Sequence, residues 1–278
     1  MKQVVLVTGA SSGIGKDVSL RLLEGGYVVY GVARRLNPMD SLVEKGARVM
    51  EMDILENTAI EKVVATIMKE QGRLDILINN AGYATWGAVE TVSLQDARRQ
   101  FDVNIFGLAS LTKKVIPIMR QQNSGKIINI SSMAGRIYTP FGAWYHATKH
   151  ALEGWSDCLR IELKEFGIGV VLIQPGLIST EFGDVMMVDM LERAENTPYE
   201  SKIKAMYLAT KGAYKKGLAS PPSVVTNLIL KAIRSKKPKS RYVGGKFAKL
   251  MLFIRKWFGE IVFERAVMSQ IKTINKQK

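Results

Sequence analysis

The chain has 278 residues, 47% of them hydrophobic, and a net charge of +15 at neutral pH. This length suits one large domain or two small ones, and the single cysteine, Cys158, excludes an internal disulfide bond and favours a reducing, cytoplasmic compartment. Basic residues are concentrated in the segment 231–278, which holds 14 Lys or Arg against two acidic residues. Because no nucleic-acid-reading motif accompanies them, no nucleic-acid partner is expected.

Apolar runs alternate with amphipathic stretches along most of the chain. Strands are predicted at 3–8, 27–32, 48–52, 75–79, 126–131, 169–174 and 241–243, and helices at 13–25, 57–71, 94–121, 143–166 and 221–235. In the long third helix, Ser93 is the expected N-cap and Pro117 is expected to kink the last turns. The alternation predicts an α/β fold, a Rossmann-type doubly wound parallel sheet of seven strands.

The domain organisation follows from the same pattern. We expect a dinucleotide-binding catalytic domain at 1–240, with a substrate lid at about 177–220, followed by a basic amphipathic C-terminal extension at 241–278. The first strand begins too early for a signal peptide, and no apolar run approaches the roughly 18 residues that span a bilayer. A single domain with a helical extension is therefore expected.

A glycine-rich turn joins the first predicted strand to the first helix. Glycine lets the backbone approach a phosphate closely, and the amides and dipole of the following helix favour its negative charge. The segment therefore predicts a nucleotide site. It consists of Thr8, Gly9, Ala10, Ser11, Ser12, Gly13, Ile14 and Gly15.

The end of the second strand predicts the choice of cofactor. An acidic residue here would bind the adenine ribose and select NAD, but the chain has Ala33 followed by Arg34 and Arg35. A guanidinium group can hold a 2′-phosphate, so NADP is favoured over NAD, although both arginines also suit a solvated loop. After the third strand, Asp53 is a candidate to bind the adenine amino group or to cap a turn, and Ile54 is placed beside the cofactor with it.

A tyrosine and a lysine four residues apart lie on the fourth predicted helix. Residues with this spacing share a helix face, but the chain contains the pattern three times, as Tyr145/Lys149, Tyr207/Lys211 and Tyr242/Lys246. The first pair alone has suitable neighbours, because Ser132 ends the preceding strand and Asn104 lies in the preceding helix. The other two pairs are interpreted as structural.

Taken together, these motifs resemble the short branch of the short-chain dehydrogenase/reductase family over residues 3–235. The matching motifs are the glycine turn, Asn79-Asn80-Ala81-Gly82, Asn104, Ser132, Tyr145/Lys149 and Pro175-Gly176. The resemblance implies that Tyr145 exchanges a proton with the substrate oxygen, that Ser132 donates a hydrogen bond to it, and that Lys149 holds the nicotinamide ribose. Asn104 would anchor a water that relays protons to Lys149, or would be a buried polar residue bonded to helix backbone.

Charge on Lys149 is expected to activate the phenol. A unit charge about 4 Å away is worth roughly 4 kcal/mol at an effective dielectric near 20, or about three pKa units as an upper value. The pKa of Tyr145 is therefore predicted to fall from near 10 to about 7.

The resemblance also implies further cofactor contacts. Asn79 and Gly82 would line the cofactor, with Asn80 and Ala81 holding the loop geometry, and Ile178 and Thr180 would meet the nicotinamide carboxamide. Pro175-Gly176 belongs to the same site and also suits a strand terminator. His146 and His150 have no carboxylate or cysteine partner at ligand spacing, so no metal is expected.

Substrate selection is assigned to the lid, whose apolar residues include Phe182, Met186, Met187 and Met190. A flexible apolar lid suits a lipophilic substrate, although methionines at helical spacing also suit a packed core. The facing wall is expected from Tyr138, Phe141 and Trp144. These features resemble steroid- and retinol-type members of the family, and a lipid ketone is a further possibility.

The predicted function is therefore an NADP-dependent oxidoreductase that interconverts a carbonyl and an alcohol on a mainly apolar small molecule. The alternatives are an NAD-preferring alcohol dehydrogenase of the same fold and a non-catalytic protein that senses NADP(H). The resemblance implies a homodimer or a homotetramer.

The extension contains a basic amphipathic segment at 247–258. Its apolar residues Phe247, Leu250, Met251, Ile254, Trp257 and Phe258 are expected broadly on one helical face. Such a helix suits peripheral contact with a membrane, packing on the lid, or packing on a neighbouring subunit.

Overall fold

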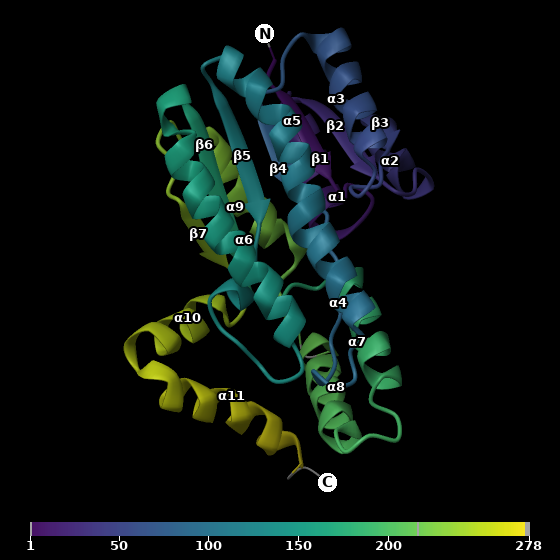
Figure 1. The fold of residues 1–278 in the computed structure, drawn as a ribbon, viewed down its shortest axis with the longest axis vertical. Helices are drawn as coiled ribbons and strands as arrows, with labels where there is room; N and C mark the ends of the chain where they lie inside the picture. Colours follow the sequence, from purple (N-terminus) through teal and green to yellow (C-terminus); the bar gives the residue numbers. More distant parts are fainter. Residues whose placement is uncertain (1, 216, 276–278) are drawn as a thin grey trace.

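A computed structural model describes residues 2–215 and 217–275 (Figure 1). Within these residues, seven parallel strands form one sheet in the order β3-β2-β1-β4-β5-β6-β7. The strands are β1 (Val4–Thr8), β2 (Val28–Ala33), β3 (Arg48–Glu51), β4 (Ile76–Asn79), β5 (Gly125–Ile130), β6 (Ile168–Pro175) and β7 (Arg241–Gly244). The predicted doubly wound parallel sheet is confirmed.

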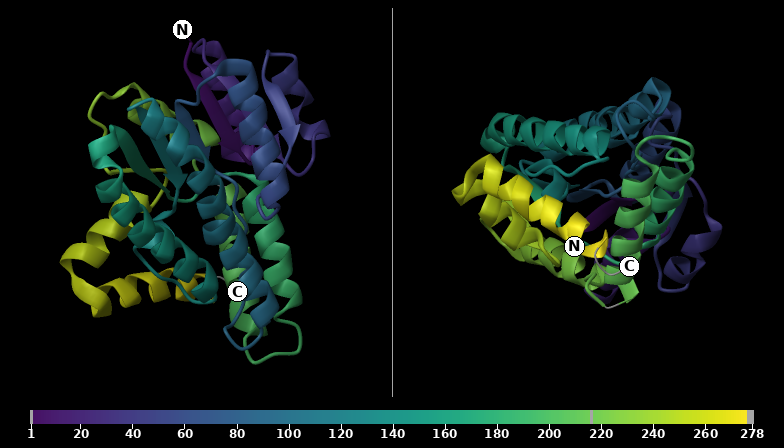
Figure 2. Two further views of the ribbon diagram at one scale, coloured as in Figure 1. Left: turned by 45° about the horizontal axis from the view of Figure 1, so that its top comes forward. Right: turned by 90° about the horizontal axis from the view of Figure 1, so that it is seen from below.

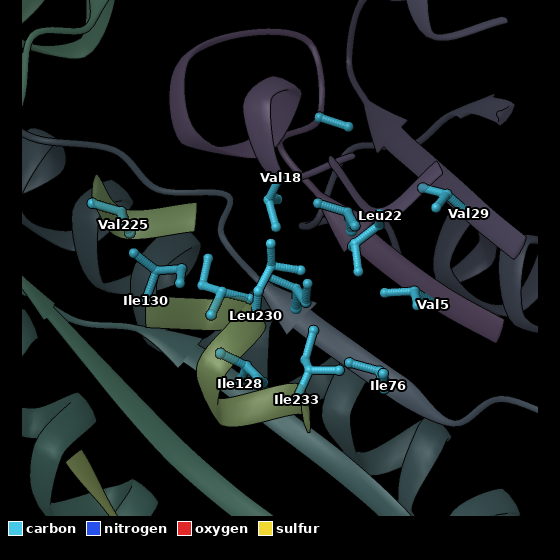
Figure 3. Close-up of a cluster of buried hydrophobic side chains, with 14 of the residues drawn as sticks. Val5, Val18, Leu22, Val29, Ile76, Ile128, Ile130, Val225, Leu230 and Ile233 are labelled. Carbon is cyan, nitrogen blue, oxygen red and sulfur yellow. The ribbon is translucent and has the colours of Figure 1, made fainter. Parts of the chain in front are cut away.

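The side chains of β1 alternate between two hydrophobic cores, because successive strand residues point to opposite faces of a sheet. Val5 and Val7 belong to the core under α1 (Gly13–Glu24) and α9 (Pro222–Arg234), which Figure 3 shows. Val4 and Leu6 belong to the core on the other face. With both faces covered, every residue of the strand is buried and apolar side chains are favoured throughout.

Three longer helices cover the second face. They are α3 (Asn57–Gln71), α5 (Leu108–Gln121) and α6 (Ala143–Glu162), and each contributes apolar side chains to the second core. Burying one such side chain stabilises the fold by about 1.5–3 kcal/mol. The two cores therefore stabilise the sheet on both faces, while the ends of its strands are not covered by these cores.

The direction of chain progression reverses between β1 and β4. β1 pairs with β2 on one side and with β4 on the other, through Val5↔Val29 and Val5↔Ile76. Loops leaving these strands at their carboxyl ends run in opposite directions, which opens a crevice there. The glycine turn after β1 and the Asn80–Gly82 loop after β4 both lie at this point.

The predicted helix at 94–121 is divided into three parts. It begins as α4 (Leu94–Phe101), passes through a π-helical segment at Asp102–Gly107, and continues as α5. Ser93 is the N-cap as predicted, since its hydroxyl accepts a bond from the Asp96 amide at 3.0 Å. Pro117 lies within α5, whereas the interruption of the helix occurs earlier, around Asn104.

Further helices, α2 (Asp40–Val43), α7 (Glu181–Glu192) and α8 (Glu200–Lys215), lie outside the predicted set, while α10 (Ala248–Trp257) confirms the helix expected at 247–258. The short α2 follows β2, α7 and α8 form a hairpin in the predicted lid, and α10 and α11 (Gly259–Asn275) form the extension. Figure 2 shows α11 running from α10 toward α8, which it contacts. Among the described helices, none has the length and apolar character needed to cross a membrane.

Candidate active site

The glycine turn after β1 has the backbone that a phosphate site requires. Gly9 and Gly13 have φ values of +65° and +52°, which side chains disfavour. A Cβ atom on Gly15 would overlap the Gly9 carbonyl oxygen, so this position accepts only glycine. A cavity of 430 Å³ beside the turn is lined by Gly13, Ser179, Thr180, Glu181 and Tyr214. The turn, with Ser11 and Ser12 partly exposed, therefore fits the pyrophosphate of a dinucleotide.

Thr8 joins this turn to the loop after β4. Its hydroxyl accepts bonds from the amides of Asn80 and Ala81 at 3.0 and 2.9 Å. In return, the Asn80 side-chain amide donates to the carbonyl oxygens of Thr8 and Gly9, at 3.0 and 3.1 Å. The predicted residues Thr8, Gly9, Asn80 and Ala81 are thus brought together, and their mutual bonds hold the two walls of the crevice in register.

Positive charge gathers at the end of β2. Ala33 is buried at the strand end, and Arg34 and Arg35 are exposed directly after it. Lys16, from the first turn of α1, reaches the same loop and donates to the Pro38 carbonyl at 3.2 Å. Three cations therefore lie where an acidic residue would select NAD.

Asp53 adopts the turn-capping alternative. Its carboxylate accepts a bond from the Leu55 amide at 3.0 Å. Ile54 is buried against the π-helical segment, where a Cβ atom on Gly107 would meet the Ile54 carbonyl oxygen at 2.7 Å. A bond from Asp53 to the adenine stays a prediction.

Ser132, Tyr145 and Lys149 converge at the carboxyl ends of β5 and β6. The Ser132 hydroxyl bonds the Tyr145 hydroxyl, and it also accepts a bond from the Ala134 amide at 3.1 Å. One helical turn further, the Lys149 ammonium donates to the Ile130 carbonyl at 2.9 Å and lies 5.9 Å from the centre of the Tyr145 ring. Part of Tyr145 remains exposed.

The predicted activation of Tyr145 by Lys149 is wrong for this structure. Burial is the largest influence on the phenol and raises the pKa of Tyr145 to about 12, while the bond with Ser132 lowers it in part. Desolvation disfavours the phenolate more than the lysine favours it, because the ammonium is directed to the Ile130 carbonyl. At neutral pH the hydroxyl therefore retains its proton and is suited to donate it.

The pKa of Lys149 is shifted in the opposite direction, below its ordinary value. Burial lowers the pKa of Lys149 to about 8, and the nearby Glu153 carboxylate counteracts part of this shift. Glu153 is buried on the same helix, where it accepts bonds from Gln174 at 2.9 Å and Arg241 at 2.8 Å. Glu153 and Arg241 thus form a partly buried ion pair, one helical turn after Lys149.

Asn104 occupies the π-helical segment and ties two elements together. Its side chain bonds both the amide and the carbonyl of Tyr83, each at 2.8 Å, and donates to the Thr148 hydroxyl at 3.2 Å. It is thus a buried polar residue, as the alternative expected, but its backbone partner is the loop residue Tyr83 and not helix backbone. A water relay through Asn104 stays a prediction.

The aromatic wall around Tyr145 differs from the predicted one. The rings of Trp86 and Phe182 lie 6.0 and 6.3 Å from the Tyr145 ring. Tyr138 packs instead on Phe263 of the extension, and Trp144 lines an outer pocket with α4, because each points away from the crevice. Trp86 was missed, although its position in the loop after β4 placed it at the carboxyl edge of the sheet.

The lid has a core of its own. Met187 and Met190 are buried with Ala194 and Ile203 between α7 and α8, and Trp86 and Phe141 pack against this cluster. Phe141 therefore meets the lid, where its ring lies 6.1 Å from that of Tyr199. The methionines therefore form the core of the lid, the alternative that the sequence also allowed.

Residues at the end of β6 connect the sheet to the lid. Pro175 is the last residue of β6, and a Cβ atom on Gly176 would overlap the Lys246 carbonyl oxygen. Ile178 is buried, and Thr180 lines the 430 Å³ cavity next to Gly13. Gly82 lies near Asn104, whose side-chain oxygen a Cβ atom would meet at 3.6 Å.

The sequence predicted that Asn79 lines the cofactor crevice, but the structure places it elsewhere. It is buried in the sheet, where its side-chain amide donates to Asn129 at 2.9 Å and to Thr112 at 3.1 Å. As the last residue of β4, its side chain points to a helix-covered face, whereas the following residue enters the loop.

The remaining candidate groups have structural surroundings. Lys211 donates to the Tyr207 hydroxyl at 3.1 Å on the exposed side of the lid, and Tyr242 is buried in β7. Burial lowers the pKa of His146, whose ring nitrogens bond Thr139 and the Ala134 carbonyl. No group of metal-ligating side chains occurs among the residues that the structure describes.

Comparison with known families extends these observations to most of the chain. A family model described as short chain dehydrogenase matches residues 3–188. A curated relative from Bacteroides thetaiotaomicron, named 3-ketodihydrosphingosine reductase, is 34% identical over 249 residues, covering 90% of each chain. Another, from Ornithobacterium rhinotracheale, is named NADPH-dependent 3-dehydrocapnine reductase and is 34% identical over 247 residues, covering 86% of each.

A solved structure is similar over the whole chain. It is a short-chain dehydrogenase from Streptomyces avermitilis, 29% identical, with a TM-score of 0.79 and coverage of 100% of this chain and 99% of that one. The similarity therefore includes the lid and the extension as well as the sheet.

Proposed function

This chain belongs to the short-chain dehydrogenase/reductase family, whose members are oxidoreductases that bind nicotinamide cofactors, and we propose that it is an NADPH-dependent reductase of lipophilic ketones or aldehydes. The observation that carries the proposal is the convergence of Tyr145 with Ser132, which lowers the pKa of the phenol in part, and with Lys149, whose ammonium lies 5.9 Å from the centre of the Tyr145 ring.

The charge states favour carbonyl reduction. Because burial raises the pKa of Tyr145 to about 12, the phenol is protonated at neutral pH and can donate to a substrate oxygen. The Ser132 hydroxyl is placed to donate a second hydrogen bond to the same oxygen as negative charge develops there. The nicotinamide supplies the hydride. Lys149 holds positive charge behind the phenol at pH values below about 8.

Three features support NADP as the cofactor. Gly9, Gly13 and Gly15 form a cradle in which a Cβ atom would clash or force strain. Arg34 and Arg35 would hold the 2′-phosphate, with Lys16 adding positive charge. A relative at 34% identity carries NADPH in its name.

An apolar crevice supports a lipid-like substrate. Trp86 and Phe182 flank Tyr145, and the methionine-lined lid packs beside them. The relative from Bacteroides thetaiotaomicron is named for the reduction of a sphingoid ketone. We therefore favour a lipid ketone over the steroid or retinoid that the sequence also suggested.

The experiment that tests the proposal measures turnover. Consumption of NADPH and NADH should be followed against a panel of lipid ketones, aldehydes and steroids, with the chain and with Tyr145→Phe. We expect NADPH-dependent reduction that falls at least about 100-fold in the variant, with cofactor affinity nearly unchanged. Faster reaction with NADH would favour the NAD-preferring alternative, and cofactor binding without any turnover would favour the NADP(H)-sensing protein.

Cofactor choice has its own test. The double variant Arg34→Ala/Arg35→Ala should raise the KM for NADPH about tenfold or more, while the KM for NADH stays the same. The matched control is Lys236→Ala/Lys237→Ala, which removes two exposed charges from the segment preceding β7. If both double variants raise the KM for NADPH equally, only the overall positive potential of the protein affects NADPH binding, and not the position of Arg34 and Arg35.

Assembly and location extend the proposal. Family members typically form oligomers, and we expect a homodimer or a homotetramer, which light scattering would measure. Cys158 is exposed and unpaired, which fits a reducing cytoplasmic compartment.

A further inference from the structure

The helical extension forms an elbow whose outer surface is apolar. Leu250, Phe253 and Trp257 lie at helical spacing on the outer side of α10 and are exposed by 56%, 52% and 65%. Phe258 at the turn and Ile261 in the first turn of α11 continue the surface, with 55% and 68% exposed. We call these residues, together with the half-exposed Val262, the elbow surface.

This surface differs from the face that the sequence predicted. Met251 is buried and Ile254 is partly buried against the segment 133–138, whereas Phe253, on the opposite side, is exposed. The aromatic rings of the elbow surface touch one another: Phe253 lies 6.5 Å from Trp257 and 5.9 Å from Phe258, between ring centres. The exposed rings therefore form one contiguous patch.

Packing beneath the elbow makes the patch a fixed surface. Phe263 is fully buried against Ile137, and the Tyr138 hydroxyl donates to Glu264 at 3.1 Å. The Arg255 guanidinium lies 5.5 Å from the centre of the Tyr138 ring. α11 also contacts the lid helix α8 (Figure 1). The exposed rings are thus held rigidly beside the segment that follows Ser132.

Positive charge surrounds the patch. Lys249, Phe253 and Lys256 share a helix face, and the Lys256 ammonium lies 4.9 Å from the centre of the Trp257 ring. The nearby acidic groups are engaged: Glu260 pairs with Arg255 at 2.7 Å, and Glu264 accepts from Tyr138. Lys249 and Lys256 form no ion pair with the residues that the structure describes. Rings flanked by such lysines match the boundary between the headgroups and acyl chains of an anionic bilayer.

We propose that the elbow surface docks the protein on an anionic lipid membrane. A second copy of the chain fits less well, because a two-fold contact would place Lys249 and Lys256 of each copy against those of the other. Docking at the elbow would hold the lid helix α8, which α11 contacts, close to the bilayer. This binding requires no turnover and stands apart from the proposed reductase activity.

Vesicle flotation of the full chain tests the proposal. Vesicles of phosphatidylcholine with phosphatidylglycerol are compared with vesicles of phosphatidylcholine alone, for the chain and for Phe253→Ser/Trp257→Ser. We expect the unaltered chain to bind neutral vesicles about tenfold more weakly than anionic ones. On anionic vesicles, we expect the double variant to bind at least about tenfold more weakly than the unaltered chain. The matched control, Val43→Ser/Ile161→Ser, changes two exposed apolar residues elsewhere and should bind as the unaltered chain does.

Charge reversal provides an independent variant that leaves the aromatic rings in place. Lys249→Glu/Lys256→Glu should also lower partitioning onto anionic vesicles about tenfold or more, and added salt should weaken binding of the unaltered chain. Each elbow variant should reduce a small ketone at the unaltered rate, which separates this proposal from the catalytic one. Absence of binding to anionic vesicles, or equal binding by the elbow variants, would overturn it. The proposal would also be overturned if an elbow variant dissociates an oligomer of the chain while its binding to vesicles stays unchanged.

Discussion

Ser132 and Ser131 offer a test of catalysis at the scale of one hydroxyl. Ser132 bonds the Tyr145 hydroxyl, whereas the buried Ser131 hydroxyl forms no side-chain bond in the described part of the protein. Ser132→Ala should lower kcat about 100-fold or more with little change in cofactor affinity, because it removes a donor to the substrate oxygen. Steady-state kinetics would measure this. Ser131→Ala is the control and should retain most of the activity; equal losses would refute the assigned role.

Lys149 should leave a signature in the pH dependence of stability. Its pKa in the folded chain is about 8 against an ordinary 10.5, so between these values the unfolded chain binds more protons. Stability therefore rises with pH, by about 2 kcal/mol between pH 8 and 10. Denaturant unfolding of Lys149→Met should lack this rise. Above pH 10 the raised pKa of Tyr145 acts in the opposite sense, which limits the useful window.

The control for Lys149 is Lys211→Met, in the second tyrosine–lysine pair, where the lysine is exposed. It should keep the rise in stability between pH 8 and 10. If Lys149→Met also shows the rise in stability between pH 8 and 10, the rise does not come from the buried Lys149 ammonium, and the prediction is wrong.

Residue identities and residue charge states differ in how well sequence predicts them. Ser132, Tyr145 and Lys149 were selected from order and spacing, and the structure brings them together. The direction of the Tyr145 shift was wrong because desolvation depends on packing by residues far apart in the chain. The helix spacing set the lysine near the phenol but did not specify its partner, the Ile130 carbonyl.

Two glycines test the strand–turn–helix element and the catalytic helix. A Cβ atom at Gly15 meets the Gly9 carbonyl, whereas one at the exposed Gly154 in α6 has no heavy atom within 4 Å. Gly15→Ala should lower the free energy of unfolding by about 1–3 kcal/mol and weaken cofactor binding. Gly154→Ala should raise it by about 0.5–1 kcal/mol, because alanine favours the helix. Denaturant unfolding measures both, and destabilisation by the second would contradict the open space around it.

Elements with strong periodicity were predicted well, and elements stabilised by neighbours were not. The seven strands and α1, α3 and α9 follow the predicted ranges closely. The π-helical segment at Asp102–Gly107 has no signature in local pattern, because Asn104 is held by Tyr83 and Thr148 from distant elements. The lid hairpin likewise closes on a core to which Trp86 and Phe141 contribute from outside it.

At the scale of the whole molecule, the inner side of the extension packs on the segment that follows Ser132. Phe263 is fully buried beside Ile137, whereas Phe253 on the elbow surface is half exposed. Phe263→Ala should lower the free energy of opening of α11 by about 3–5 kcal/mol, and Phe253→Ala by less than about 1. Hydrogen exchange of the α11 amides measures both, and equal protection in the two variants would contradict this packing.

The sequence by itself determined the parallel sheet, the glycine turn and the grouping of Ser132 with Tyr145, because each depends on residues close together in the chain or on strands that end at one edge. Tertiary structure decided which aromatic residues face Tyr145, which way its pKa shifts, and which side of α10 is exposed. Those properties arise from contacts between segments far apart in the chain, such as Trp86 with Tyr145 and Tyr138 with Glu264, and local patterns of hydrophobicity do not encode such pairings.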